Sequence, residues 1–443
     1  MAFQETIEYL FGLQKYGIKF GLTNSALLME RMNEPHRRFR SVHIAGTNGK
    51  GSTASFLDSM LRAAGYRVGL YTSPHLVSFT ERIRIDGMPV SEQQVVKLAD
   101  RVRQCAAGTG PDGREALSPT FFEVTTAMAF TCFAESAVDI AVIETGMGGR
   151  LDSTNVIMPL VSVITNIDLE HTEFLGPTLA AIAGEKAGII KPGIPVVTCT
   201  VQPEAVAVLE KEAARKAAPL YRLAKDFGPD RISPGVFPSF DYRGIAVNYS
   251  GLRTNLLGRH QVTNASLALA AVECLAAAGV SVSERAVRSG LEQAAWPGRL
   301  EQAGSRPDIY LDGAHNPASA AVLAEALGEL KRGKGRLVLV LGILRDKDHR
   351  RIIERLVPLA DRVIVTKPQY DRAMDIRALA GEVRILQTDV TTADSVSAAI
   401  NLARGSASED DLIVITGSLY TVGDARAIFR QGPAGDPLRG LKG

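Results

Sequence analysis

Cysteine is scarce in this chain of 443 residues. The four cysteines are scattered along the chain and show none of the spacings of a metal site. This excludes a disulfide-stapled secreted scaffold and a thiolate metal centre, and it is typical of buried thiols in a reducing compartment. They are Cys105, Cys132, Cys199 and Cys274.

Long hydrophobic runs and a surplus of one charge are also missing. No stretch approaches the roughly 18 apolar residues of a membrane span. The N-terminal stretch MAFQETIEYLFGLQKYG lacks the basic segment and the continuous apolar core of a signal peptide. The formal net charge is only +2 and no long basic run occurs, which argues against a nucleic-acid surface. We expect a cytoplasmic monomer with no membrane or nucleic-acid partner.

A glycine-rich segment, GTNGKGS at 46–52, stands between an apolar strand-like run and a helix-like run that begins near Thr53. Backbone N–H groups at such a helix start favour an anion, and a lysine adds a positive charge. The segment therefore predicts a phosphate-binding loop formed by Asn48, Gly49, Lys50, Gly51 and Ser52. Its spacing departs from the common phosphate loop, and a βα turn that binds nothing is the alternative.

Short apolar strands alternate with helices over most of the chain, which favours parallel sheets covered on both faces. The first sheet should contain strands near 39–44, 66–71, 138–143, 161–165 and 194–199, and residues 225–257 resemble a small antiparallel insert. A second alternating unit follows a turn at Pro297, with strands near 309–311, 337–341, 362–365, 383–386 and 412–415. We predict an α/β protein with a phosphate-loop parallel-sheet ATPase domain over 1–297 and a smaller Rossmann-like α/β domain over 298–443.

Polar residues follow the predicted strands of the first domain. Ser73, Glu144 and His171 each come just after a strand, and ligands of open parallel sheets bind at this edge. Together with Ser52, they predict a divalent cation site beside the phosphates. Magnesium prefers oxygen, so the histidine leaves the identity of the cation open. Taken singly, Ser73 and His171 fit solvated loop residues equally well.

The chain resembles the folylpolyglutamate synthase/dihydrofolate synthase family of the Mur-ligase superfamily. The resemblance runs over most of the chain, and it includes the unusual phosphate-loop spacing. Nine ordered motifs carry it: GTNGKGS at 46–52, TSPHL at 72–76, FFE at 121–123, GMGGRLDSTN at 146–155, DLEHTEFLG at 168–176, EKAGIIK at 185–191, PGRLE at 297–301, DGAHNP at 312–317 and GSLY at 417–420.

The resemblance implies ATP-dependent formation of an amide bond between a carboxylate and L-glutamate. ATP phosphorylates the carboxylate, the amine of L-glutamate attacks the acyl phosphate, and phosphate leaves. The first domain would then be an ATP-binding Mur-ligase-like central domain, and the second a glutamate ligase domain. The cofactors implied are ATP and Mg²⁺, with two magnesium ions expected.

The family's functional residues match several positions of this sequence. Lys186 corresponds to a lysine that family members carry as an N-carbamate, and with Lys50, Glu144 and His171 it is expected to be catalytic. Asn264, Arg299 and Asp312 join the phosphate loop as expected ATP contacts. His315 and Ser418 are weaker candidates for the glutamate end of the site. A nucleotide held between two domains would close them on binding.

The choice of carboxylate substrate rests on two further motifs. By resemblance, the pterin or folate contacts are Thr120, Phe121, Phe122, Glu123, Leu151, Asp152 and Ser153. An aromatic such as Phe122 can pack on a pterin ring, although a core phenylalanine at a helix start fits as well. We expect both activities, on dihydropteroate and on reduced folates. The alternatives are a synthase that only extends folates, or another Mur-type amino-acid ligase, against which TSPHL and GGRLD argue.

Overall fold

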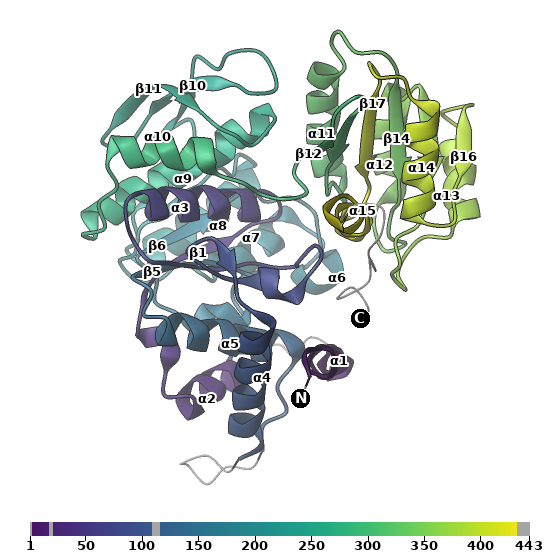
Figure 1. The fold of residues 1–443 in the computed structure, drawn as a ribbon. Coiled ribbons are helices and arrows are strands. Elements are labelled where there is room, and N and C mark those ends of the chain that lie inside the picture. The colour runs from purple at the N-terminus through teal and green to yellow at the C-terminus, as the bar shows by residue number, and fades with distance from the viewer. Residues whose placement is uncertain (1, 17–20, 109–115, 432–443) are drawn as a thin grey trace.

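Two separate sheets organise the computed structural model, which describes residues 2–16, 21–108 and 116–431 (Figure 1). The larger sheet has eight strands and the smaller, C-terminal one has six. A third sheet of three short strands belongs to the N-terminal half. In the part of the chain that is described, no helix combines the length and the apolar character needed to cross a bilayer.

The eight-stranded sheet has β1 near its centre, between β5 and β6. Six of its strands run parallel, while β3 and β4 are an antiparallel edge. In spatial order the strands are β4 (Met88–Pro89), β3 (Ile83–Ile85), β2 (Val68–Tyr71), β5 (Ile140–Glu144), β1 (Arg40–Ala45), β6 (Val161–Ile164), β7 (Val196–Thr198) and β8 (Leu220–Arg222).

Helices cover this sheet on both faces, because its central strands β1, β5 and β6 are mostly apolar and are buried at all but the first position of β1. Ile140 and Val142 pack on the face that carries α3 (Lys50–Ala63), α9 (Arg259–Ala277) and α10 (Glu284–Gln293). The alternate residues Ala141 and Ile143 pack on the opposite face. That face carries α1 (Phe3–Gly12), α2 (Thr23–Arg31), α4 (Glu92–Ala107), α5 (Phe121–Glu135), α7 (Leu179–Ala187) and α8 (Pro203–Arg215).

The predicted antiparallel insert is present as a sheet of β9 (Gly228–Asp230), β10 (Ser239–Arg243) and β11 (Asn248–Arg253). It packs on α9, where the Glu273 carboxylate accepts hydrogen bonds from the Tyr242 hydroxyl at 2.7 Å and from the Ala246 amide at 2.6 Å. The insert is therefore a support for α9, whose N-terminal end reaches the phosphate loop.

The six-stranded sheet repeats the two-faced pattern. Its order is β12 (Glu301–Gly304), β13 (Asp308–Leu311), β17 (Leu412–Thr416), β14 (Leu337–Leu341), β15 (Arg362–Val365) and β16 (Val390–Thr392), with only β12 antiparallel. One face packs on α11 (Pro317–Leu330), α12 (His349–Leu356) and α13 (Ile376–Val383), and the other on α14 (Val396–Ser406) and α15 (Leu419–Gln431). In Figure 1, α11 and α15 lie on the side that faces the N-terminal half.

Three expectations about secondary structure need correction. The strand expected over 383–386 is wrong: α13 continues to Val383 because Leu379, Ala380 and Val383 bury one helical face, whereas Ile385 is 79% exposed. The helix after the phosphate loop begins at Lys50 rather than near residue 53, because Gly49 adopts the left-handed conformation that starts it. The sheets are also not purely parallel at their edges.

Candidate active site

A cavity of about 330 Å³ lies between the two sheets. One wall consists of residues that follow β1, β2, β5 and β6, and the other of residues that follow β13 together with the start of α11. The carboxyl ends of both parallel sheets therefore meet at one cleft. Its lining includes Asn48, Gly49, Lys50, Gly51, Ser52, Ser73, Glu144, His171, Asn264, Arg299, Asp312 and His315, all of which the sequence nominated.

The phosphate loop connects the end of β1 to the start of α3, and its Gly49 is closely packed. Gly49 has φ +85°, and a Cβ there would lie 2.5 Å from Oδ1 of Asn264. The loop is also held from below, since the Asn48 amide donates to Asn166 Oδ1 at 2.7 Å. The Lys50 ammonium folds back on its own loop and donates to the carbonyls of Gly46 at 3.0 Å and Thr47 at 3.2 Å. The loop thus presents a helix start and a lysine to the cleft.

Glu144 is a buried carboxylate at the end of β5. Among the residues that the structure describes, its carboxylate accepts one hydrogen bond, from the Ser73 amide at 3.3 Å. Burial raises its pKa to about 7, against the positive charge of Lys50 and the Ser73 hydrogen bond, which both lower it. A carboxylate so poorly supplied with donors is suited to a cation.

Lys186 and His171 are close enough for the charge of Lys186 to act on His171. Lys186 lies on α7 and is 3% exposed, and burial followed by the charge of Lys50 lowers its pKa to about 7. It is not among the residues that line the cavity. The side chain of His171 is exposed, and desolvation lowers its pKa to about 4 although Glu170 opposes this. His171 also has φ +52°, a strained conformation that non-glycine residues adopt mainly where structure or function demands it.

The donor set fits magnesium better than a transition metal. Within the described residues no cluster of three or more histidine, cysteine, aspartate or glutamate side chains could hold a metal ion. The nominated set, Ser52, Ser73, Glu144 and His171, has one carboxylate and two hydroxyls at the cleft. Magnesium is usually held by one or two carboxylates together with phosphate oxygens and waters, so the residues present fit it only with a nucleotide bound.

The second wall carries polar groups that are already hydrogen-bonded. Asp312 accepts from the amides of Leu300 and Ala314, each at 2.9 Å, while Arg299 donates to the Gly298 carbonyl at 2.9 Å. Ser418 does not line the cavity: its hydroxyl caps α15, with the Thr421 amide at 3.0 Å. The structure therefore brings Asp312, Arg299 and His315 to the cleft and leaves Ser418 beside it.

The nominated pterin contacts gather at the start of α5 and in the loop after β5, outside the residues that line the cavity. Thr120 and Glu123 form a capping box, with the Thr120 amide 2.7 Å from Glu123 Oε2. Asp152 accepts from the amides of Gly146 and Met147 at 2.8 and 3.0 Å. These three side chains have local structural roles whether or not they also bind a ligand.

The aromatic and small members of this group are arranged differently. The ring of Phe122 packs on Gly146, which lines the cavity, so closely that a Cβ at Gly146 would lie 2.5 Å from it. Phe121 instead stacks on Phe11, with ring centroids 5.5 Å apart. Ser153 is buried at the start of a 3₁₀ turn, and Leu151 is half-buried just before it.

Several residues in or beside the cleft were not predicted from the sequence as site residues. His260 and Gln261 come from the start of α9, and Glu170 and Asn316 from the turns after β6 and β13. Lys347, in the loop after β14, approaches Glu170 from the second domain. Glu170 and Asn316 lie inside quoted motifs next to nominated residues, and their position after a strand was the available signal. Nothing local distinguished Lys347.

Comparison with known proteins supplies independent evidence. The Mur ligase middle domain matches residues 44–272, and the glutamate ligase domain of Mur ligases matches residues 298–419. A dihydrofolate synthase/folylpolyglutamate synthase of Bacillus subtilis is 40% identical over 96% of this chain and 98% of its own length. A Mycobacterium tuberculosis folylpolyglutamate synthase, solved with ADP and AMPPCP, is 38% identical over 97% of this chain and 99% of its own, with a TM-score of 0.87. Escherichia coli FolC, solved with DHPP and ADP, is 30% identical over 97% and 98%, also with a TM-score of 0.87.

Proposed function

Because the chain belongs to the Mur ligase family, among the dihydrofolate synthases/folylpolyglutamate synthases, we propose that it uses ATP to join L-glutamate to dihydropteroate and to the γ-carboxylate of reduced folates. The observation that carries this proposal is the cleft in which a phosphate loop faces the carboxyl edge of a second sheet. The first domain, over 1–297, binds ATP and the acid, and the second, over 298–443, brings the amine.

The first step transfers the γ-phosphoryl group of ATP to the substrate carboxylate, which crowds negative charge into one place. Catalysis is then mainly positioning and neutralisation. Lys50 and the amides of Gly49, Gly51 and Ser52 hold the phosphates, which requires Lys50 to exchange its loop carbonyls for phosphate oxygens. Asn48 and Asn264 support the loop, and Arg299 and Asp312 contact ATP from the linker and the second domain.

Magnesium would be held by Ser52, Ser73, Glu144 and His171, and it would neutralise charge between the phosphates and the incoming carboxylate. The pKa of about 7 at Lys186 leaves a large neutral fraction of its amine near neutral pH. A neutral amine attacks carbon dioxide, forming an N–C bond and releasing a proton, so that the cation becomes an N-carbamate anion. This supports a carbamylated Lys186 as a partner of the cation site.

The second step is attack of the L-glutamate amine on the acyl phosphate. His315 lies at the cleft and Ser418 just beside it, at the turn that starts α15, which supports their assignment to the glutamate end. For the acid, the contact of Phe122 with Gly146 supports a pterin site entered from the cleft side of α5. Thr120, Phe121, Glu123, Leu151, Asp152 and Ser153 would form the rest of its wall.

Phosphate release from the purified protein tests the function directly. The assay supplies Mg-ATP and L-glutamate with either dihydropteroate or tetrahydrofolate. We expect turnover with both acids, and full turnover only when acid and L-glutamate are both present. Turnover with tetrahydrofolate alone would reduce the function to folate extension and would refute the pterin assignment. Silence with both acids, in folded protein that binds ATP, would favour another Mur-type ligase.

A further inference from the structure

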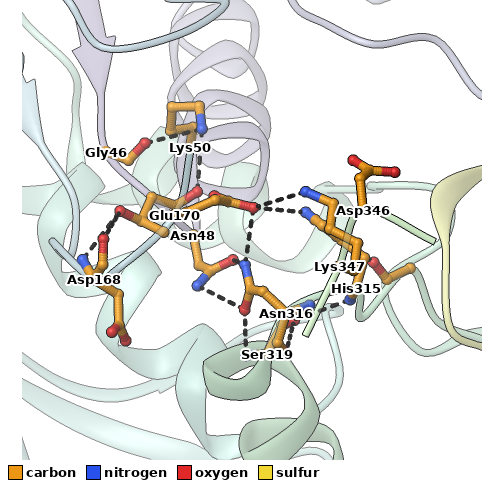
Figure 2. Close-up of polar contacts among 12 residues, drawn as sticks. Gly46, Asn48, Lys50, Asp168, Glu170, His315, Asn316, Ser319, Asp346 and Lys347 are labelled. Atoms are coloured by element: carbon orange, nitrogen blue, oxygen red, sulfur yellow. Dashed lines mark hydrogen bonds and ion pairs between the residues drawn. The ribbon is translucent and has the colours of Figure 1, made fainter. Parts of the chain in front are cut away.

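One carboxylate of the first domain has three polar partners in the second. Figure 2 shows Glu170 between the two domains, with His315, Asn316 and Lys347 directed at it. Its Oε1 lies 3.2 Å from His315 Nε2, 3.2 Å from Asn316 Nδ2 and 3.6 Å from Lys347 Nζ. Two separate segments of the second domain, the β13–α11 turn and the loop after β14, thus converge on a single side chain.

The contact is charged and mostly withdrawn from water. The side chains of Glu170 and Lys347 are 11% and 16% exposed. The other ring nitrogen of His315 lies 2.8 Å from the Gly313 carbonyl, so both ring nitrogens have a hydrogen-bond partner and the ring is held in place. Removing one partner of such a group leaves the others uncompensated.

The same contact is tied to the phosphate loop at two points (Figure 2). Asn316 and Asn48 exchange amide hydrogen bonds across the cleft, at 3.0 and 3.4 Å. The loop that carries Glu170 is fixed by Thr47, whose hydroxyl donates to the Asp168 carbonyl at 3.2 Å and faces the Asp168 amide at 3.0 Å. The second domain therefore docks on the element that holds the phosphates.

We propose that Glu170 is a positioning residue that docks the second domain onto the phosphate loop, through His315, Asn316 and Lys347. The second-domain groups reach the nucleotide and the incoming amine only while this contact is made. In this role Glu170 acts through its second-domain partners. The kinetic part of this inference rests on the proposed function, whereas the docking itself does not.

Glu170→Gln removes the charge and keeps the size of the side chain. We expect kcat to fall about 100-fold, as for a misplaced reacting group, while equilibrium binding of ATP alone changes much less because its phosphate cradle is in the first domain. Small-angle scattering should show a larger radius of gyration. Glu170→Asp should recover part of kcat, and the matched control Glu173→Gln, an exposed residue three positions on, should match wild type.

A double-mutant cycle with Lys347→Met separates docking from a general loss of stability. If the two residues act through their mutual contact, the double variant loses little more than either single variant. Additive losses, or a Glu170→Gln protein with wild-type kcat and radius of gyration, would overturn the inference. If the wild type does not release phosphate with any acid, the proposed function fails. The radius of gyration of the wild type and of the Glu170 and Lys347 variants then still tests whether this contact docks the second domain.

Discussion

The two sides of the cleft differ in how well their buried charged side chains are hydrogen-bonded. Among the described residues of the first domain, the Lys186 ammonium makes no hydrogen bond, and the Glu144 carboxylate accepts only that of the Ser73 amide, at 3.3 Å. In the second domain, Asp312 accepts two backbone amides at 2.9 Å. The first wall, together with Lys186 near it, thus holds buried charged groups with few hydrogen-bond partners, whereas the buried carboxylate of the second wall is already hydrogen-bonded by the backbone.

This difference distinguishes charged side chains that await a ligand from those that stabilise the fold. A buried charge without partners costs free energy, so it persists where a ligand supplies the missing partners. The pKa values of Glu144 and Lys186, both moved to about 7, express that deficit. Asp312 is buried too, and burial raises its pKa, but its oxygens organise the turn after β13. Substitutions on the first wall should therefore damage activity, and those on the second should damage stability as well.

The largest effect is expected at Lys186. Lys186→Ala should lower phosphate release at least about 100-fold, the scale for losing one group that stabilises developing charge. Its melting temperature should stay near the wild-type value, because the ammonium makes no hydrogen bond within the described residues and its burial is costly. Turnover and a thermal melt measure the two arms.

The matched control is Lys191→Ala. Lys191 is also a lysine whose pKa burial lowers, to about 8, but its ammonium donates to the Asn155 carbonyl at 2.9 Å and lies outside the cavity lining. This variant should lose stability and keep most turnover. An unfolded Lys186→Ala protein, or one with full activity, would break the comparison.

A second test concerns His43, another buried titratable side chain of the first domain, and the pH dependence of stability that its burial causes. Burial, then the charge of Lys191, lowers the pKa of His43 to about 3. Below pH 6.5, the ordinary pKa of histidine, His43 is protonated in the unfolded chain but stays neutral in the folded one. The free energy of unfolding is therefore at its full value above pH 6.5 and falls as the pH is lowered toward 3. At pH 4 the loss is about 3 kcal/mol.

His43→Gln should remove this acid sensitivity. Urea unfolding at pH 7 and pH 4 measures it: the free energy of unfolding should fall less between the two pH values in the variant than in wild type. An equal fall in both proteins would mean that His43 is protonated in the folded state. The His43 contact with the Thr154 hydroxyl, at 2.8 Å, is the one that glutamine must replace.

The smallest effect is expected on the second wall. Asp312→Ala leaves the buried amides of Leu300 and Ala314 without an acceptor, which should cost about 1–3 kcal/mol of unfolding free energy in addition to lost turnover. Asp312→Asn keeps one acceptor oxygen and should lose less stability. Chemical denaturation of both variants is the measurement, and an unaltered stability in Asp312→Ala would place Asp312 with the deficient charges of the first wall.

Much of the fold was predictable because it depends on local pattern. The apolar runs around Val142 and Leu339 fill both faces of their sheets, and alternating strands and helices leave few other arrangements. The prediction failed over 383–386, where an apolar run ends a helix and then stays exposed. Local hydrophobicity cannot distinguish these outcomes, because burial depends on what packs against the segment.

The sequence by itself determined the phosphate loop, since glycine, lysine and a helix start in that order define a backbone cradle within a few residues. It also determined the family, through nine ordered motifs. Only the tertiary structure decided which charges are left unsatisfied and which are hydrogen-bonded, and that Glu170 meets Lys347 across 177 positions of chain. Desolvation and long-range pairing depend on atoms distant in sequence, so no local pattern contains them.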